Sequence, residues 1–328
     1  MIGYYVHHQG LGHLHRAGAI TEHLTVPVTV LSSLPTRPWH HLQEWVQLPS
    51  DAGVADDDVS GDPTAGGVLH WAPTRHHGLR DRMSAISDWI RRAAPDLVVV
   101  DVSVEVALLC RLHGVPTVVM GMPGDRSDRP HRLAYDSADA VLAPWAAEFA
   151  RTSWPESWRS KTFHAGSISR FDASHPPFHE REAGPWRALR LTGSGGTHGV
   201  GPGAPSVVPG WQWTVAHGLD EDEVRAAIDR ADVVVTHAGQ NALAEVAALS
   251  TPAVVVPEER PHGEQYDTAA VLEAAGLAVV AGPDDTWADL LPAALQLGGD
   301  GWARWRSGGG APAAATYLDN LVAAHRSA

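Results

Sequence analysis

The chain has 328 residues, of which 44% are hydrophobic and 19% are charged, and its formal net charge is −14 at pH 7. This length suits two domains of about 150 residues each, and the apolar fraction is that of a soluble globular protein. The negative charge argues against a nucleic-acid partner, which would need a basic surface. Cys110 is the only cysteine, so an internal disulfide is excluded and a cytoplasmic location is expected.

Short apolar runs alternate with helical stretches in both halves of the chain, which is typical of parallel sheets built from strand–helix–strand units. The run at residues 2–6 is a predicted buried strand with no basic region before it, so we expect no signal peptide. No run approaches the roughly 18 apolar residues of a membrane span. In the first half we predict strands at residues 2–6, 26–31, 97–101, 117–120 and 140–142, and a helix at residues 78–94.

A polar, Pro-rich stretch between Phe163 and Pro177 has the composition of a linker. After it we predict strands at residues 188–192, 212–216, 233–235, 253–256 and 278–281, and a last helix at residues 314–324. The predicted domains are an N-terminal domain at residues 1–165, a linker at 166–186, a C-terminal domain at 187–310 and a terminal helical segment at 311–328.

The most specific motif is VVVTHAGQNALAEV at residues 233–246, an apolar strand followed by a small-residue turn and a helix that begins near Asn241. A helix start offers free backbone N–H groups and the positive end of the helix dipole, which suit a phosphate. His237 and Asn241 add side-chain donors, and Glu245 lies one turn later, where its carboxylate can accept from a ribose hydroxyl pair. The motif therefore predicts a cradle for a nucleotide diphosphate. The alternative is an ordinary strand–helix unit with a polar cap, which needs only one such residue.

The pattern T-H-x-G-x-N-x-x-x-E, with E-Q-Y-D after the next strand, resembles the donor half of GT-B glycosyltransferases. It is most similar to glycosyltransferase family 28 and shares features with family 1. The resemblance implies an α/β fold of the GT-B type, with two Rossmann-like domains whose parallel sheets face a central cleft. It also implies that the His/Gly turn meets the pyrophosphate, that the Glu of the helix binds the ribose, and that the later Glu/Gln pair holds sugar hydroxyls. It further implies that the last helix returns to the N-terminal, acceptor-side domain. The implied donor-binding residues are His237, Ala238, Gly239, Gln240, Asn241, Glu245, Glu264 and Gln265.

The loop HHQGLGHLHR at residues 7–16 follows the first predicted strand. Its glycines do not complete a dinucleotide fingerprint, because His15 occupies the place of the third glycine and the second strand lacks a following acidic residue. The loop resembles the G-x-G-H that opens the acceptor domain of family 28 and related transferases. The resemblance implies that Gly12 lets the backbone approach the sugar and that His13 faces the cleft as general base. Asp101 matches the place where family 1 transferases keep the carboxylate that orients this base; as an alternative, it caps the next helix.

A second glycine loop, TGSGGTHGVGPGAP at residues 192–205, follows the first strand of the predicted C-terminal domain. Consecutive backbone N–H groups in such a loop form an anion-binding nest. In the family this loop meets the diphosphate and the donor sugar, which implies donor-binding roles for Ser194, Gly195 and Gly196. The sequence departs from the family pattern because it stays Gly/Pro-rich instead of entering a long helix, and a flexible linker is the alternative.

We expect no metal ligands and no cofactor. The N-terminal loop holds several histidines without a cysteine, clustered too closely on one loop for good tetrahedral geometry, and no Asp-x-Asp metal clamp is evident. The predicted protein is an inverting, metal-independent glycosyltransferase that moves a sugar from a nucleotide-sugar, such as UDP-N-acetylglucosamine, to a hydroxyl acceptor. The nucleotide-sugar is a co-substrate, and the sequence identifies neither the acceptor nor an oligomeric state.

Two other functions stay open. A UDP-N-acetylglucosamine 2-epimerase-like isomerase shares the fold but needs further catalytic carboxylates, for which Glu105 and Asp125 are the available residues. A non-enzymatic nucleotide-sugar binder is the second, although retention of both His13 and Glu245 argues against it. The acceptor is either a small molecule or lipid-linked, and a lipid-linked acceptor would bring peripheral membrane contact. The helix at residues 78–94 is either a membrane-facing patch or an amphipathic helix packed on its sheet; the residues that suggest a patch are Arg80, Arg82, Trp89, Arg91 and Arg92.

Overall fold

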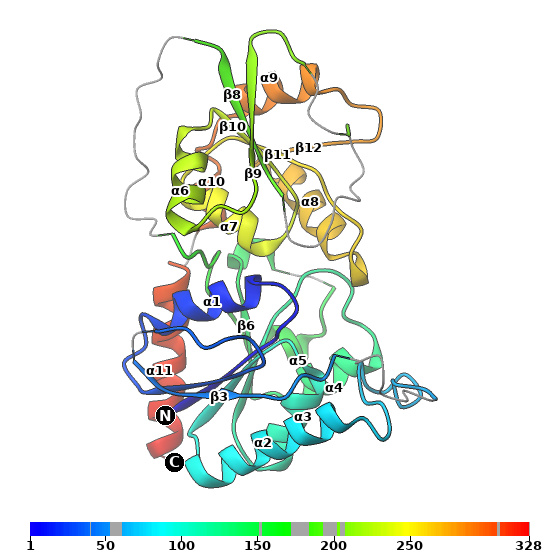
Figure 1. The fold of residues 1–328 in the computed structure, drawn as a ribbon, viewed down its shortest axis with the longest axis vertical. Helices are drawn as coiled ribbons and strands as arrows, with labels where there is room; N and C mark the ends of the chain where they lie inside the picture. The colour runs from blue at the N-terminus through cyan, green and yellow to red at the C-terminus, as the bar shows by residue number, and fades with distance from the viewer. Residues whose placement is uncertain are drawn as a thin grey trace.

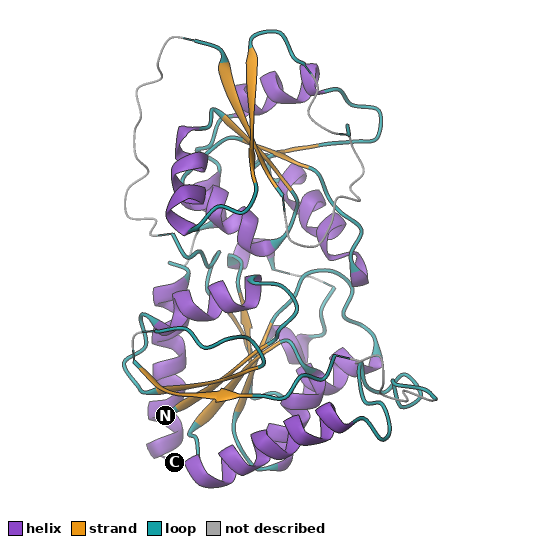
Figure 2. Cartoon of the chain, viewed as in Figure 1, coloured by secondary structure: helices purple, strands orange, loops and turns teal. Residues whose placement is uncertain are grey.

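Two parallel β-sheets organise the chain, and helices pack on their faces (Figures 1 and 2). The computed structural model describes residues 1–39, 41–52, 61–150, 153–171, 184–192, 202–203, 207–306 and 309–327. We call the seven-stranded sheet with its helices the first lobe, and the five-stranded sheet with its helices the second lobe. The second lobe lies at the top of Figure 1 and the first lobe at the bottom.

The sheet of the first lobe has the order β3-β2-β1-β4-β5-β6-β7, and all neighbouring strands are parallel. The strand order reverses between β1 and β4, and a crevice forms outside the carboxyl ends of strands at such a point. The register pairs Val6 with Asp101, so β1 and β4 end side by side. The strands are β1 (Ile2–Val6), β2 (Val28–Ser32), β3 (Leu42–Gln47), β4 (Leu97–Asp101), β5 (Thr117–Met120), β6 (Ala140–Ala143) and β7 (Thr162–His164).

The sheet of the second lobe has the order β12-β11-β10-β8-β9 and is also parallel throughout. Its order reverses between β8 and β10, so the loops after these two strands flank the expected ligand crevice of this lobe. Its strands are β8 (Trp186–Leu191), β9 (Trp211–Ala216), β10 (Val233–Thr236), β11 (Ala253–Val255) and β12 (Val279–Val280).

The alternation of side chains along β1 shows how the first sheet is covered on both faces. Tyr4 and Val6 share a core with the helices α1 and α11, whereas Tyr5 faces the core that contains α2. Among the described helices, none is long and apolar enough to cross a membrane. The α-helices are α1 (Gly12–Thr21), α2 (His77–Ala93), α3 (Val104–Leu112), α4 (Arg129–Ser137), α5 (Glu156–Arg159), α6 (Glu221–Arg230), α7 (Gln240–Ala248), α8 (Glu264–Ala274), α9 (Trp287–Leu297), α10 (Trp302–Trp305) and α11 (Ala311–Ser327), with short 3₁₀ helices η1 (Ala147–Phe149) and η2 (Pro261–Gly263).

The last helix, α11, packs on the first lobe beside α1, as the red and blue helices of Figure 1 show. Its buried face, which includes Ala314 and Leu318, belongs to the same core as β1. Two polar contacts hold its outer face. The Asp319 carboxylate accepts from the backbone N–H of Thr25 at 2.9 Å, and Arg326 donates to Asp96 at 2.8 Å. The chain therefore enters the second lobe and returns to the first.

The predicted fold class, two α/β domains with parallel sheets, is confirmed. Each predicted strand exists, and its ends differ from the prediction by at most two residues; the strand predicted at residues 26–31, for example, is Val28–Ser32. The two edge strands of the first lobe's sheet, β3 and β7, were not predicted. The sequence of β3 lacks a regular apolar–polar alternation and half of it is exposed, and β7 has only three residues.

Candidate active site

The histidine predicted as general base lies at the crevice of the first sheet. His13 occupies the first turn of α1, and Asp101 is the last residue of β4. The Nδ1 atom of His13 is 2.8 Å from Oδ1 of Asp101. The Asp101 side chain is completely buried, whereas that of His13 is 18% exposed, so the ring is partly accessible. Ser103 caps the helix after β4, and Asp101 is therefore not its cap.

Arg16 completes this cluster from the next turn of α1. Its Nε donates to Oδ2 of Asp101 at 3.0 Å, and its Nη2 donates to Oδ1. Burial alone would raise the pKa of Asp101, but the charges of Arg16 and His13 outweigh burial and hold this pKa well below its usual range. Because the carboxylate stays ionised, it accepts from Nδ1–H of His13. The basic lone pair of a neutral His13 is then on Nε2.

Helices α1 and α7 meet across the interface between the lobes. Nη1 of Arg16 donates to Oε1 of Gln240, the first residue of α7, at 2.7 Å. A Cβ atom added at Gly12 would lie 2.2 Å from Nδ2 of Asn241, so the backbone of α1 approaches this amide closely. The residues predicted on the acceptor side and those predicted on the donor helix are therefore in direct contact.

The turn between β10 and α7 arranges donors toward the carboxyl edge of the second sheet. Nδ1 of His237 accepts from the backbone N–H of Gly239 at 2.9 Å, and burial lowers the pKa of this histidine. The imidazole is therefore neutral with its proton on Nε2, which leaves Nε2–H as a donor. In the described part of the chain, no side chain caps α7 at Gly239. The first N–H groups of α7 and the positive end of its dipole thus remain available to an anion.

Glu245 is buried on α7 and paired with Arg170. Nε of Arg170 donates to Oε1 of Glu245 at 2.8 Å, and the exposed Glu221 lies 3.7 Å from the same guanidinium. Burial raises the pKa of Glu245, and Arg170 offsets only part of that effect. Among the described residues, Arg170 engages Oε1 of Glu245, and the second carboxylate oxygen could accept from a ribose hydroxyl.

Glu264 and Gln265, at the start of α8, make different contacts. Oε1 of Gln265 accepts from the backbone N–H groups of Ala238 at 3.1 Å and Glu258 at 2.9 Å, which ties the loops after β10 and β11 together. Glu264 accepts from Arg126 of the first lobe at 2.8 Å. Gln265 therefore has only its amide N–H groups left for a sugar, and Glu264 shares its carboxylate with an arginine from across the interface.

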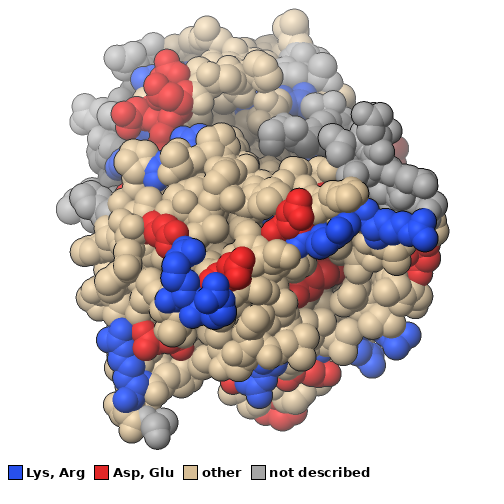
Figure 3. Space-filling view, turned by 60° about the horizontal axis from the view of Figure 1, so that its bottom comes forward, with Lys and Arg blue, Asp and Glu red and all other residues tan. Residues whose placement is uncertain are grey.

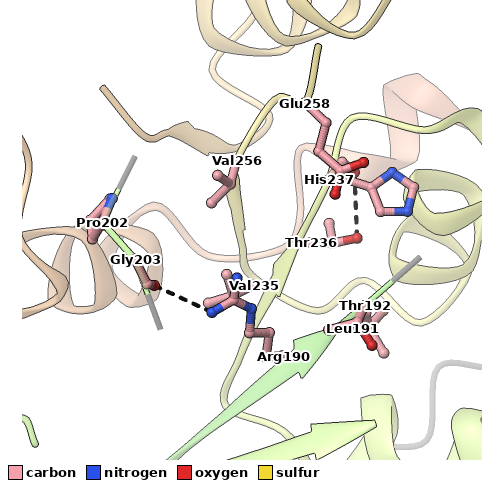
Figure 4. A pocket seen from close by; sticks show the side chains of 10 residues that line it. All are labelled: Arg190, Leu191, Thr192, Pro202, Gly203, Val235, Thr236, His237, Val256 and Glu258. Atoms are coloured by element: carbon pink, nitrogen blue, oxygen red, sulfur yellow. Dashed lines mark hydrogen bonds between the residues drawn. The ribbon is translucent and has the colours of Figure 1, made fainter. Parts of the chain in front are cut away.

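A cavity of about 70 Å³ lies at the carboxyl edge of the second sheet (Figure 4). Among the described residues this volume is well below the roughly 300–1,000 Å³ of typical ligand pockets, so it matches a part of a nucleotide rather than a whole one. Arg190 at its floor donates to the carbonyl of Gly203 at 3.3 Å. The lining residues come from the ends of β8, β10 and β11 and from the described part of the glycine loop: Arg190, Leu191, Thr192, Pro202, Gly203, Val235, Thr236, His237, Val256 and Glu258.

The described residues contain most, but not all, of the predicted donor site. Ser194, Gly195 and Gly196 lie outside them. Sequence reasoning missed Arg16, Arg126 and Arg170, each of which pairs with a predicted site residue. Only Arg16 carried a signal, because it follows His13 by three residues and shares its helix face. Arg170 fell in the predicted linker, and Arg126 had no motif around it.

The prediction of no metal ligands covered the histidines of the N-terminal loop, which pack against one another. The rings of His7 and His8 stack at 4.8 Å, and burial, with the nearby histidines, lowers the pKa of His7 to about 3. Elsewhere, however, one group in the described part of the chain has the spacing of a metal site, and no sequence pattern indicated it: His70, Asp128, His131 and His262.

Two of the residues that suggested a membrane-facing patch on helix α2 are buried. Arg82 is fully buried and donates to the hydroxyl of Tyr5 at 2.7 Å, and Trp89 is 1% exposed. Arg92 reaches solvent but pairs with Glu44 at 2.8 Å. On the face drawn in Figure 3, basic and acidic groups lie next to one another among a larger neutral area. Packing of α2 on its sheet therefore explains Arg82 and Trp89.

Two parallel-sheet lobes, with a histidine–aspartate pair at the edge of one and a helix without a side-chain cap at the edge of the other, have the architecture of the GT-B class of glycosyltransferase folds. Within that class, residues 221–297 match the glycosyltransferase family 28 C-terminal domain, which confirms the resemblance predicted from the donor motif. A curated relative from Erwinia tasmaniensis, the UDP-N-acetylglucosamine–N-acetylmuramyl-(pentapeptide) pyrophosphoryl-undecaprenol N-acetylglucosamine transferase, is 31% identical over 147 residues. The matched region covers 37% of this chain and 41% of that relative, so the chain spans less than half the length of the relative.

Solved structures extend the likeness of fold over the whole chain. MurG from Acinetobacter baumannii has a TM-score of 0.62 at 16% identity, with 98% of this chain and 99% of that chain covered. The calicheamicin glycosyltransferase CalG4 has a TM-score of 0.64 at 15% identity, with 98% of both chains covered. At these identities the comparison establishes the GT-B fold.

Proposed function

We propose that this protein is a glycosyltransferase that moves a sugar from a nucleotide-sugar to a hydroxyl acceptor bound between the lobes. The observation that carries the proposal is the direct contact of the two half-sites. The cluster of His13, Asp101 and Arg16 on the first lobe meets the start of α7 on the second through the Arg16–Gln240 hydrogen bond of 2.7 Å. In the described part of the chain, the proposed base lies on the first lobe and the proposed anion site on the second, so the reaction would need both.

Nε2 of His13 takes the proton of the acceptor hydroxyl, while Nδ1–H stays bound to Asp101 and the developing imidazolium is stabilised by that carboxylate. The acceptor oxygen attacks the anomeric carbon from the face opposite the leaving nucleotide, which inverts the configuration there. Negative charge then grows on the leaving phosphate. The N–H groups at the start of α7 and Nε2–H of His237 are oriented before the reaction, so they favour the transition state over the ground state. This step needs no metal ion.

The donor is proposed to be a UDP-sugar such as UDP-N-acetylglucosamine, with its ribose on Glu245 and its diphosphate at the turn of His237. The name of the Erwinia tasmaniensis relative, which begins with UDP-N-acetylglucosamine, supports this choice. The same name contains an undecaprenol carrier, whereas CalG4 is named for calicheamicin, so both lipid-linked and small-molecule acceptors are represented among the similar proteins.

The isomerase alternative would require two further catalytic carboxylates, and the positions of the two candidates disfavour it. Glu105 is committed to the loop before α2, where its Oε1 accepts from the backbone N–H groups of His70 at 2.8 Å and Trp71 at 3.1 Å. Asp125 is exposed and accepts from the N–H of Ser127 at 2.9 Å in a local turn. Neither side chain is held ready for proton abstraction from a sugar carbon.

The test begins with a thermal-shift screen of the purified protein against UDP-, dTDP- and GDP-sugars. The stabilising nucleotide-sugar is then incubated with small-molecule and lipid-linked hydroxyl acceptors, and released nucleotide and the anomeric configuration of the product are measured. We expect transfer with inversion by the wild type and by His23→Ala, a control at an exposed histidine after α1. His13→Ala should bind the nucleotide and lose transfer. Conversion of the nucleotide-sugar to an isomer without acceptor would instead establish the isomerase.

A further inference from the structure

Three histidines and one aspartate converge where the loop before α2, the start of α4 and the turn before α8 meet. Asp128 is at the centre of the group: its Oδ2 lies 2.7 Å from Nδ1 of His131 and 3.4 Å from Nδ1 of His262, and its Oδ1 lies 3.7 Å from Nε2 of His70. The three imidazole rings pack against one another, with centroid separations of 4.5 Å between His70 and His131 and 4.7 Å between His131 and His262. One potential ligand atom from each residue lies within 4.8 Å of all the others.

These distances are close to those of a tetrahedral zinc site. With zinc bonds of about 2.0–2.1 Å, neighbouring ligand atoms are roughly 3.3–3.4 Å apart. The measured contacts of Asp128, from 2.7 to 3.7 Å, fall on both sides of this value. All four ligand atoms lie within 4.8 Å of one another, so closing the group around a cation requires side-chain rotations that bring the more distant atoms together. Three imidazole nitrogens with one carboxylate oxygen suit zinc and related transition metals, whereas magnesium and calcium prefer oxygen ligands throughout.

The backbone holds two of these side chains in place. Asp128 caps α4, since its Oδ1 accepts from the backbone N–H of His131 at 2.9 Å, and this hydrogen bond orients the carboxylate as outer-shell contacts orient metal ligands. His262 has φ of 64°, a left-handed conformation that is costly for a residue other than glycine. Such conformations gather at ligand sites, where the surrounding contacts maintain them.

The group joins the two lobes. His70, Asp128 and His131 belong to the first lobe, and His262 comes from η2 in the second. The interface around them is tight: the backbone N–H of Asp125 donates to the carbonyl of His262 at 3.0 Å. At Gly124, which has φ of +87°, an added Cβ would lie 2.5 Å from that same carbonyl oxygen. A cation bound here therefore connects the lobes with three ligands from one and one from the other.

Arg126 lies beside the group, and its positive charge would repel a bound cation. Its ion pair with Glu264 offsets that charge. Its Nη1 is 3.3 Å from Nε2 of His131, which is long for a hydrogen bond. The guanidinium has stronger partners in Glu264 at 2.8 Å and the carbonyl of Pro123 at 2.7 Å. The charge of Arg126 is thus offset by Glu264, and Nδ1 of His131 faces Asp128 rather than the arginine.

We infer that His70, Asp128, His131 and His262 form a binding site for a zinc-class divalent cation that links the two lobes. The site is separate from the proposed base and from the start of α7, and it does not rest on the proposed transfer reaction. Its role is to fix η2, and with it the start of α8, against the first lobe.

The test uses the tag-free full chain after treatment with a chelator. Zn²⁺ is titrated against a competing chromophoric chelator, and Co²⁺ is used as a spectroscopic probe of coordination geometry. We expect one Zn²⁺ per chain and the strong visible absorption of tetrahedral Co²⁺. His262→Ala and His70→Ala should each weaken Zn²⁺ binding by about 100-fold or more, since loss of a direct ligand exceeds the loss of an outer-shell partner. His325→Ala, at an exposed histidine on α11, is the matched control and should bind as the wild type does.

A second readout separates a link between the lobes from a site on one lobe. Zn²⁺ should raise the thermal unfolding temperature of the wild type and of His325→Ala, but not of His262→Ala, which removes the ligand from the second lobe. Circular dichroism without metal establishes that each variant is folded. No stoichiometric Zn²⁺ binding by the wild type would overturn the inference. So would equal binding by the wild type, His70→Ala and His262→Ala, which would show adventitious binding to surface histidines only.

Discussion

Replacing Asp101 by asparagine keeps the shape of the side chain and removes the charge on which the proposed base depends. Asp101 is 0% exposed and Arg16 is 3% exposed, so the substitution leaves a buried guanidinium without its carboxylate. Removing one partner of a buried ion pair costs about 3–5 kcal/mol. We expect the lower end of this range for Asp101→Asn, because the amide oxygen still accepts from Arg16 and Arg16 keeps its hydrogen bond to Gln240.

The free energy of unfolding is measured by urea denaturation at pH 7 for the wild type, Asp101→Asn, Arg16→Met and the double variant. Because the two side chains are in contact, the double variant should be less destabilised than the sum of the single variants, by about 1–3 kcal/mol. The pH dependence gives an independent check. The pKa of Asp101 is lower in the folded protein than in the unfolded chain, so the ion pair stabilises above the unfolded value of about 3.9. That stabilisation is lost as the pH falls below this value, and Asp101→Asn should lack this part of the acid sensitivity.

The reasoning would be refuted if Asp101→Asn lowered the free energy of unfolding by less than about 1 kcal/mol and the effects of the two single variants were additive. A loss that small is typical of an ion pair exposed to solvent. Transfer activity then distinguishes the structural role from the catalytic one. The double variant should be less destabilised than the two single changes added together. His13 still lacks its carboxylate partner in this variant, so turnover should stay low. If turnover rose together with the free energy of unfolding in the double variant, Asp101 would act only through folding.

Three further outcomes follow from the contacts of the site. His13→Ala should lower turnover by roughly 10²–10⁴-fold with nucleotide affinity nearly unchanged, because a general base contributes to the chemical step; full turnover with an identified acceptor would place the base elsewhere. Glu245→Ala should weaken UDP binding by about 1–3 kcal/mol in calorimetry, since a ribose hydroxyl pair loses its acceptor; unchanged affinity would remove Glu245 from the donor site, and Arg170→Ala measures how much of any loss comes from the broken ion pair. Gly239→Ala should weaken UDP binding as well, because its Cβ would lie 2.4 Å from Cε1 of the His237 ring and displace the imidazole; binding equal to that of the wild type would show that the orientation of His237 is irrelevant.

The sheets were predictable because their strands are buried runs of β-branched residues. The five residues of β4 and the four of β10 are all buried, and such continuous apolar runs mark parallel strands covered on both faces. The turn after β10 was predictable for a different reason. A small-residue turn with several polar side chains before an alanine-rich helix has few other uses, and the helix does begin at Gln240, one residue from the predicted Asn241.

The partners of the site residues were beyond sequence reasoning because they join distant parts of the chain. Arg170 precedes Glu245 by 75 positions, and Arg126 precedes Glu264 by 138. Neither arginine lies in a periodic or motif-bearing segment, so only the folded chain brings the pairs together. The histidine cluster has the same origin, since His262 reaches the first lobe from a 3₁₀ turn of the second.

Arg16 makes contacts of different strength with Asp101 in its own lobe and with Gln240 in the other lobe. The difference shows how the proposed base is kept in position. Within the first lobe, Arg16 donates two charge-assisted hydrogen bonds to a buried carboxylate, and such bonds are about twice as strong as neutral ones. Between the lobes, the same arginine donates to a neutral amide, Gln240, at 2.7 Å. If the lobes separate, the amide contact breaks first, and Asp101 still holds both Arg16 and His13. The proposed base is therefore organised by the first lobe alone, and the contact with Gln240 places the start of α7 beside it.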